Sequence, residues 1–183
     1  NNHSGISGGG IYGSNGIIQV SDNASIIGNL ADYDGGGISY TNPNSGNTSM
    51  VLKITGGCIA GNKSRLKEIS GGNNGGGIYL ETAKYNNVIE GNAVISNNTS
   101  KNGGGVCLNK SKMILGGNAL IAANKADIKG GGIYCVGVDG EGKIGDKVII
   151  AGNTVNGKLN SLETEDNGVL TTLPTFNGYI EQG

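Results

Sequence analysis

The chain has 183 residues, 37 of them glycine, with a formal net charge of −1 and a hydrophobic content of 36%. The glycines do not recur at every third position and proline occurs only twice, which excludes a collagen triple helix. The near-neutral charge offers no electrostatic footprint for nucleic acid, and no apolar run reaches the roughly 18 residues that span a bilayer. We therefore expect neither a nucleic-acid partner nor direct insertion into a membrane.

Two motifs recur in register along the chain. The first is a Gly-Gly-Gly triplet followed by Ile or Val, and it starts at Gly8, Gly35, Gly75, Gly103 and Gly130. The second is an Ile three positions before an Asn. Its isoleucines are Ile26, Ile59, Ile95, Ile121 and Ile150, and its asparagines are Asn29, Asn62, Asn98, Asn124 and Asn153. Internal periodicity of this kind is the signature of a repeat architecture.

Each repeat contains three short apolar runs separated by Gly, Asn, Asp and Ser, and none carries a helical period. In the repeat that starts at Gly75, these runs cover 77–80, 87–90 and 93–96. Such runs indicate strands. Three strands per repeat predict an all-β fold, a single right-handed parallel β-helix of about five coils with a period of about 27 residues.

In such a solenoid, equivalent residues stack about 4.8 Å apart along the axis. We expect the second-motif isoleucines to form one inward row, and the residues after each triplet, Ile11, Ile38, Ile78, Val106 and Ile133, to form another. The asparagines should form a ladder at a turn, with left-handed backbone geometry and amides bonded to the coils on either side. The triplets should supply a bend that needs positive φ or close backbone approach.

The repeats cover 1–157, and 158–183 reads as an atypical C-terminal coil or closing segment. Two insertions, near 41–49 and 65–74, should project as loops on the side of the rod. Asn2 precedes the first triplet at the same offset as Asn29 precedes the second, so the chain begins in mid-repeat. We expect a fragment of a longer repeat region, with further coils of the parent protein adjoining it.

The pairing of Ile-x-x-Asn with Gly-Gly-Gly-Ile resembles the Phe-x-x-Asn and Gly-Gly-Ala-Ile motifs of chlamydial polymorphic outer-membrane proteins. More broadly, the chain is similar to the glycine-rich β-helix passengers of autotransporter and adhesin-like surface proteins. The resemblance spans about 2–153, with Ile in place of Phe and Gly in place of Ala. It implies a secreted or cell-anchored stalk involved in adhesion.

Carboxylates that could act as a catalytic pair are scattered in the sequence. Asp32 and Asp34 flank Tyr33 and read as solvated turn acids, and the acidic loop 139–146 is a weak candidate for a cation. His3 reads as a surface residue of a frayed end. The three cysteines, Cys58, Cys107 and Cys135, fall in different columns and read as unpaired thiols. We therefore expect no catalytic residues, no metal site and no cofactor.

One surface feature follows from the alternation of side chains along a strand. The residues after the inward row read Tyr12, Ser39, Tyr79, Cys107 and Tyr134, so tyrosine rings should recur on alternate coils on the outer face. Such rings could stack on sugars or meet an aromatic partner surface, or they could simply shield the nearby glycine backbone. Tyr12, Tyr79 and Tyr134 are the candidate ligand-binding residues.

These observations favour a non-enzymatic, extracellular module of a microbial cell surface, an adhesin-like rod that presents a binding face to a glycan or protein. The alternative is a fragment of a carbohydrate-active β-helix, a polysaccharide lyase or glycosidase. Its active residues would then lie in the insertions or outside this chain.

Overall fold

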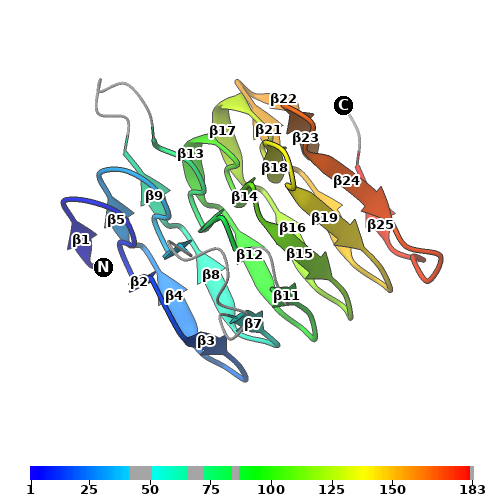
Figure 1. Cartoon of the computed structure of the whole chain (residues 1–183), viewed down its shortest axis with the longest axis horizontal. Helices are drawn as coiled ribbons and strands as arrows, with labels where there is room; N and C mark the ends of the chain where they lie inside the picture. The colour runs from blue at the N-terminus through cyan, green and yellow to red at the C-terminus, as the bar shows by residue number, and fades with distance from the viewer. Residues whose placement is uncertain (42–50, 66–71, 84–86, 182–183) are drawn as a thin grey trace.

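The computed structural model describes residues 1–41, 51–65, 72–83 and 87–181. Over these residues the chain is all β, with no helix, and winds into a parallel β-solenoid of about five coils with a spacing of about 29 residues. The coils follow one another along the rod from the N-terminal to the C-terminal end (Figure 1). The predicted fold class is thus confirmed.

Four parallel sheets run along the rod, and each coil crosses them in the order B, C, D and A. Sheet B contains β2 (Ile11–Gly13), β6 (Ile38–Thr41), β10 (Ile78–Glu81), β14 (Val106–Asn109), β18 (Ile133–Val136) and β23 (Leu162–Glu165). Sheet C contains β3 (Ile17–Val20), β7 (Val51–Ile54), β11 (Val88–Ile89), β15 (Lys112–Leu115), β19 (Glu141–Ile144) and β24 (Val169–Thr172).

Sheet D contains β4 (Ser25–Ile27), β8 (Cys58–Ala60), β12 (Val94–Ser96), β16 (Leu120–Ala122), β20 (Ile149–Ala151) and β25 (Tyr179–Ile180). Sheet A contains β1 (His3–Ser4), β5 (Leu30–Ala31), β9 (Lys63–Ser64), β13 (Thr99–Asn102), β17 (Lys125–Lys129), β21 (Thr154–Val155) and β22 (Lys158–Leu159). The last pair, β21 and β22, is antiparallel, so the chain reverses direction at this edge of sheet A.

The expectation of three strands per coil is wrong, because sheet A supplies a fourth. Most of its strands follow a ladder asparagine, and none has more than two consecutive apolar residues, which hides them from a search for apolar runs. Their inward positions are small residues: Ala31, Ser64, Ser100 and Ala126 are all buried. A narrow part of the cross-section therefore lies behind sheet A.

The two inward rows lie in the core as expected. Ile38, Ile78, Val106 and Ile133 pair in register on sheet B and are fully buried. The isoleucines of the second motif pair in register on sheet D, and Ile59, Ile95, Ile121 and Ile150 are buried. At the N-terminal end, Ile11 and Ile26 are only partly buried, since no described coil covers them.

The asparagine ladder is continuous from Asn29 to Asn153. Each asparagine donates from its backbone N–H and from Nδ2 to Oδ1 of the next asparagine, at 2.9–3.0 Å. From the second rung on, Nδ2 also donates to the carbonyl of the preceding coil's isoleucine. The ladder therefore satisfies buried polar groups along the whole solenoid.

The ladder asparagines themselves do not have positive φ, contrary to expectation. The residue before each of them does: Gly28, Gly61, Asn97, Ala123 and Gly152 have φ between 54° and 67°. At the turn, the residue with left-handed backbone geometry precedes the ladder asparagine, and Asn97 is an exposed example. The asparagine that follows it points inward and forms the hydrogen bonds of the ladder.

The three glycines of each triplet meet two different requirements, a positive φ and a lack of space for a Cβ. The first glycine has positive φ, as at Gly103 with 64°. The second and third lie against the next coil, where a Cβ on Gly104 would come within 2.5 Å of the Gly131 carbonyl oxygen and one on Gly105 within 2.6 Å of that of Gly132. Both expected reasons for the triplet therefore hold, at different positions.

Candidate functional site

The outer column of sheet B has the predicted register. Tyr12 pairs with Ser39, Ser39 with Tyr79, Tyr79 with Cys107 and Cys107 with Tyr134. The column ends at Glu163 on β23. The side chains that alternation assigns to the outer face of these strands therefore do stack along the rod.

The expectation of a row of exposed rings is wrong for Tyr79 and Tyr134, which are each only 5% exposed. They pack with Cys107 and Val136 in a second hydrophobic cluster, separate from the core. The Tyr79 hydroxyl accepts a bond from Asn109 Nδ2 at 2.9 Å. The two rings therefore pack in this cluster and leave little of their surface open to a ligand. Tyr12, at 56% exposed, is the one ring of the predicted three that is open to solvent.

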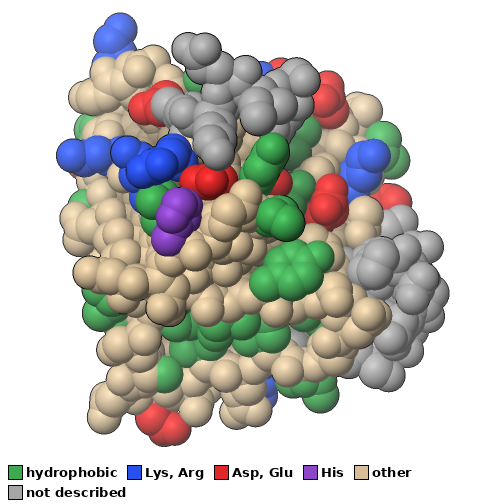
Figure 2. Space-filling view, turned by 90° about the vertical axis from the view of Figure 1, so that its left-hand side faces the viewer, with side chains coloured by type: hydrophobic (Ala, Val, Ile, Leu, Met, Phe, Trp, Pro, Cys, Tyr) green, Lys and Arg blue, Asp and Glu red, His purple; other side chains and the backbone are tan. Residues whose placement is uncertain are grey.

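Tyr12 stands at the edge of a groove of about 680 Å³, within the range of small-molecule sites. The groove runs across the first three coils, between the segment that follows β1 and the outer face of sheet B. Its lining combines small polar residues, two tyrosines and two carboxylates: Ser4, Gly5, Ile6, Ser7, Tyr12, Asp34, Ser39, Thr41, Tyr79 and Glu81. Figure 2 views this end of the rod and shows acidic and hydrophobic side chains adjoining near the centre of the face.

Asp34 is held in the groove by a second, shorter polar ladder. The Asn74 backbone N–H and Nδ2 donate to Asp34 Oδ1 at 2.8 and 3.0 Å, and Asn102 Nδ2 donates to Asn74 Oδ1 at 2.9 Å. The Asp34 N–H in turn donates to Ser7 Oγ at 3.3 Å. Asp34 is therefore not the solvated turn acid that its neighbours suggest, but a half-buried carboxylate fixed between coils.

Asp32 also departs from that expectation, since it is 5% exposed and its Oδ1 lies 2.8 Å from His3 Nε2. His3 belongs to β1 and pairs with Leu30, so the N-terminal end is not frayed there.

Among the described residues, the lining of the groove carries negative charge, from Asp34 and Glu81. Burial raises the pKa of Asp34, and the charge of Glu81 adds to this rise, while the bonds from Asn74 oppose it. Burial also raises the pKa of the Tyr79 hydroxyl and of the Cys107 thiol, and in both cases Asp34 and Glu81 contribute. Neither carboxylate forms an ion pair with another described residue, and the described lining contains no Lys, Arg or His.

Ser39 lies between Tyr12 and Tyr79 on the floor of the groove. Its side chain is fully buried, and its Oγ has no hydrogen-bond partner among the described residues. A buried hydroxyl without a partner costs free energy, so this atom marks a point at which an additional donor or acceptor would stabilise the structure.

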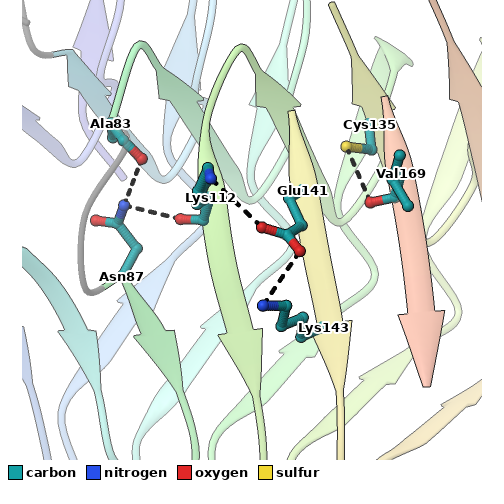
Figure 3. Close-up of polar contacts among 7 residues, drawn as sticks. All are labelled: Ala83, Asn87, Lys112, Cys135, Glu141, Lys143 and Val169. Atoms are coloured by element: carbon teal, nitrogen blue, oxygen red, sulfur yellow. Dashed lines mark hydrogen bonds and ion pairs between the residues drawn. The ribbon is translucent and has the colours of Figure 1, made fainter. Parts of the chain in front are cut away.

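The other sequence candidates lie outside this groove. In the acidic loop, Glu141 lies 3.5 Å from Lys112 and 3.2 Å from Lys143 on the outer face of sheet C (Figure 3). Its hydrogen bond with Lys143 lowers the pKa of Glu141. The described residues contain no group of three or more His, Cys, Asp or Glu side chains that could hold a metal ion. They also contain no helix long and apolar enough to cross a membrane.

All three cysteines are free, as expected. Cys107 and Cys135 are buried, and Cys135 Sγ donates to the Val169 carbonyl at 3.7 Å (Figure 3). The insertions near 41–49 and 65–74 lie largely outside the described residues, and only Thr41, Arg65 and 72–74 of them are described.

Sequence reasoning missed Asp34, Ser39, Thr41 and Glu81 as partners in one groove. One signal was available, because the residue before each triplet forms a polar column of its own: Ser7, Asp34, Asn74, Asn102 and Lys129. Comparisons with protein-family models, with curated proteins and with solved structures gave no match.

Proposed function

We propose that the chain is a non-enzymatic module of a microbial cell surface, an adhesin-like extracellular rod that presents a binding groove to a glycan. The observation that carries this proposal is the groove beside Tyr12, in which an exposed ring, hydroxyls and carboxylates are mounted on a scaffold bonded coil to coil. Rings that stack on sugars together with convergent polar groups are what saccharide recognition requires. The repeat resemblance supports the cell-surface setting.

Binding to a panel of glycans, followed by calorimetry on the hits, tests this function. Replacement of Tyr12 by Ala should weaken binding at least about tenfold, because the ring supplies the open apolar face. Tyr179→Ala is the matched control, since Tyr179 is 55% exposed but lies on sheet D, away from the groove. If Tyr12→Ala binds every hit as tightly as the unmodified chain, the groove is not the site.

A second candidate function, glycoside cleavage, is supported by one observation. Asp34 and Glu81 lie in the same groove, and the raised pKa of Asp34 favours the protonated form that a general acid needs. Release of reducing sugar or lyase absorbance from a polysaccharide panel measures this activity. Turnover that is abolished by both Asp34→Asn and Glu81→Gln would replace the binding function by an enzymatic one.

A further inference from the structure

The described part of the lining of the groove beside Tyr12 carries negative charge and no positive charge. Asp34 and Glu81 both line it, neither has an ion-pair partner among the described residues, and the described lining offers no cation. Covering two carboxylates with a neutral ligand would remove water without supplying a counter-charge, which is unfavourable. An anionic ligand would be repelled. The charge of the groove therefore favours a cationic ligand.

The ring and the hydroxyl groups of the lining indicate which kind of cationic ligand fits the groove. The exposed face of Tyr12 can attract an ammonium group or stack against a sugar ring. Hydroxyls of Ser4, Ser7 and Thr41 also line the groove. Ser4 Oγ already bonds the Ser7 carbonyl and the Ile6 N–H, whereas Ser7 Oγ accepts from the Asp34 N–H and can still donate. Ser39 Oγ lies beneath them, buried and without a hydrogen-bond partner among the described residues, so the described lining does not satisfy all of its own polar groups. A lining this rich in hydroxyls suits a polyhydroxylated ligand better than a peptide.

We infer that the groove binds a saccharide with free amino groups, such as an oligomer of glucosamine, with its ammonium groups beside Asp34 and Glu81 and a sugar ring against Tyr12. This inference rests on the proposed function and deepens it by naming the class of ligand. A volume of about 680 Å³ leaves room for a short oligomer.

Calorimetry with two tetrasaccharides of equal length tests the inference: a glucosamine tetramer and its fully N-acetylated counterpart. The free amine should bind at least about tenfold more tightly, because charge-assisted hydrogen bonds to carboxylates are lost on acetylation. Asp34→Asn and Glu81→Gln should each weaken binding of the glucosamine tetramer about tenfold, and should weaken binding of the acetylated tetramer by a smaller factor, because the amide still hydrogen-bonds to a saccharide but supplies no charge.

The variants can be interpreted because the fold should tolerate them. Asn at position 34 keeps the Oδ1 acceptor that Asn74 uses, and circular dichroism checks the fold. Asp127→Asn is the matched control, since it makes the same change in net charge at an exposed position on β17, outside the groove. It should leave both affinities unchanged.

The inference is overturned if the acetylated tetramer binds as tightly as the free amine, in which case loss of binding in Tyr12→Ala would still support a glycan module. It is also overturned if a tetralysine peptide binds more tightly than the glucosamine tetramer, since the ligand class is then a basic peptide. Failure of both tetramers and of the whole glycan panel would remove the proposed function together with the inference.

Discussion

At the scale of single residues, the ladder asparagines connect the coils through buried bonds. Asn98 donates from N–H and Nδ2 to Asn124, donates from Nδ2 to the Ile59 carbonyl, and accepts two bonds from Asn62. Asn98→Ala removes the acceptor of the Asn62 backbone N–H and of one Nδ2 hydrogen, both buried, while the bond from Asn62 Nδ2 to the Ile26 carbonyl remains. We expect the free energy of unfolding, measured by urea denaturation, to fall by about 3 kcal/mol.

The neighbouring residue provides the control for this substitution. Asn97 is exposed and has a φ of 54°, a conformation that glycine adopts without strain. Asn97→Gly should therefore change the free energy of unfolding by no more than about 0.5 kcal/mol. Equal losses in the two variants would mean that the turn, and not the ladder bond, holds these coils together.

Asp34 should make stability depend on pH. Its folded pKa is raised above its ordinary value of 3.8, mainly by burial and also by Glu81, so the folded state favours the protonated acid. Stability from this group is fully present below the unfolded pKa and is lost as pH rises through the folded pKa. Asp34→Asn removes the loss, so the stability difference between variant and unmodified chain should grow with pH above about 4.

Thermal melts of both proteins across acidic to neutral pH measure that difference. Glu141 and Glu165 act in the opposite sense, because their lysine partners lower their pKa values and their contribution is lost as pH falls. Both glutamates remain in the variant, so subtraction isolates Asp34. A difference that is constant with pH would show that Asp34 titrates alike in the folded and unfolded chain.

At the scale of the strand, alternation decides what each side chain contributes. On β16, Ile121 points into the core and is fully buried, while its neighbour Leu120 points out and is half-buried. Ile121→Ala should lower the free energy of unfolding by about 3 kcal/mol, since a cavity remains in a packed core. Leu120→Ala should cost less than about 1 kcal/mol. Urea denaturation that reverses this order would reverse the register assigned to sheet D.

The sequence predicted those elements in which the same residue type has the same structural role in every coil. Each position in the isoleucine rows, the asparagine ladder and the glycine triplets serves one dominant physical role. The same residue type therefore recurs there in every repeat and can be recognised in the sequence. Sheet A was missed because its inward positions accept Ala or Ser, and its strands carry no apolar run. Asp34 was misread because its burial depends on bonds from Asn74, 40 residues further along the chain.

The groove could not be predicted for a related reason. Alternation correctly assigned Tyr79 and Tyr134 to the outer face, but it does not report how closely stacked side chains cover one another. Exposure of a ring depends on what adjoins it in the next coil. Tyr12 differs from the other two in that no described coil lies beyond its own.

At the scale of the whole molecule, each coil contacts chiefly its two neighbours, so opening should start at the ends of the rod. The reactivity of the three cysteine thiols can show the order in which the coils open. Cys58 is partly exposed on sheet D, whereas Cys107 is buried among Tyr79, Tyr134 and Val136. Cys135 is covered from the C-terminal end, where its Sγ meets the Val169 carbonyl of β24. Loss of the last coil alone would therefore uncover Cys135 and leave Cys107 covered.

Thiol labelling under native conditions, with each site located by peptide mass, should therefore give three rates. Cys58 reacts first. Cys135 follows, slowed by burial that raises its pKa to about 11, and Cys107 reacts last because labelling requires more coils to open. Rates divided by those of the urea-unfolded chain remove intrinsic differences between the thiols. Equal corrected rates for Cys107 and Cys135 would mean that the solenoid opens as one unit, since both thiols then wait for the same event.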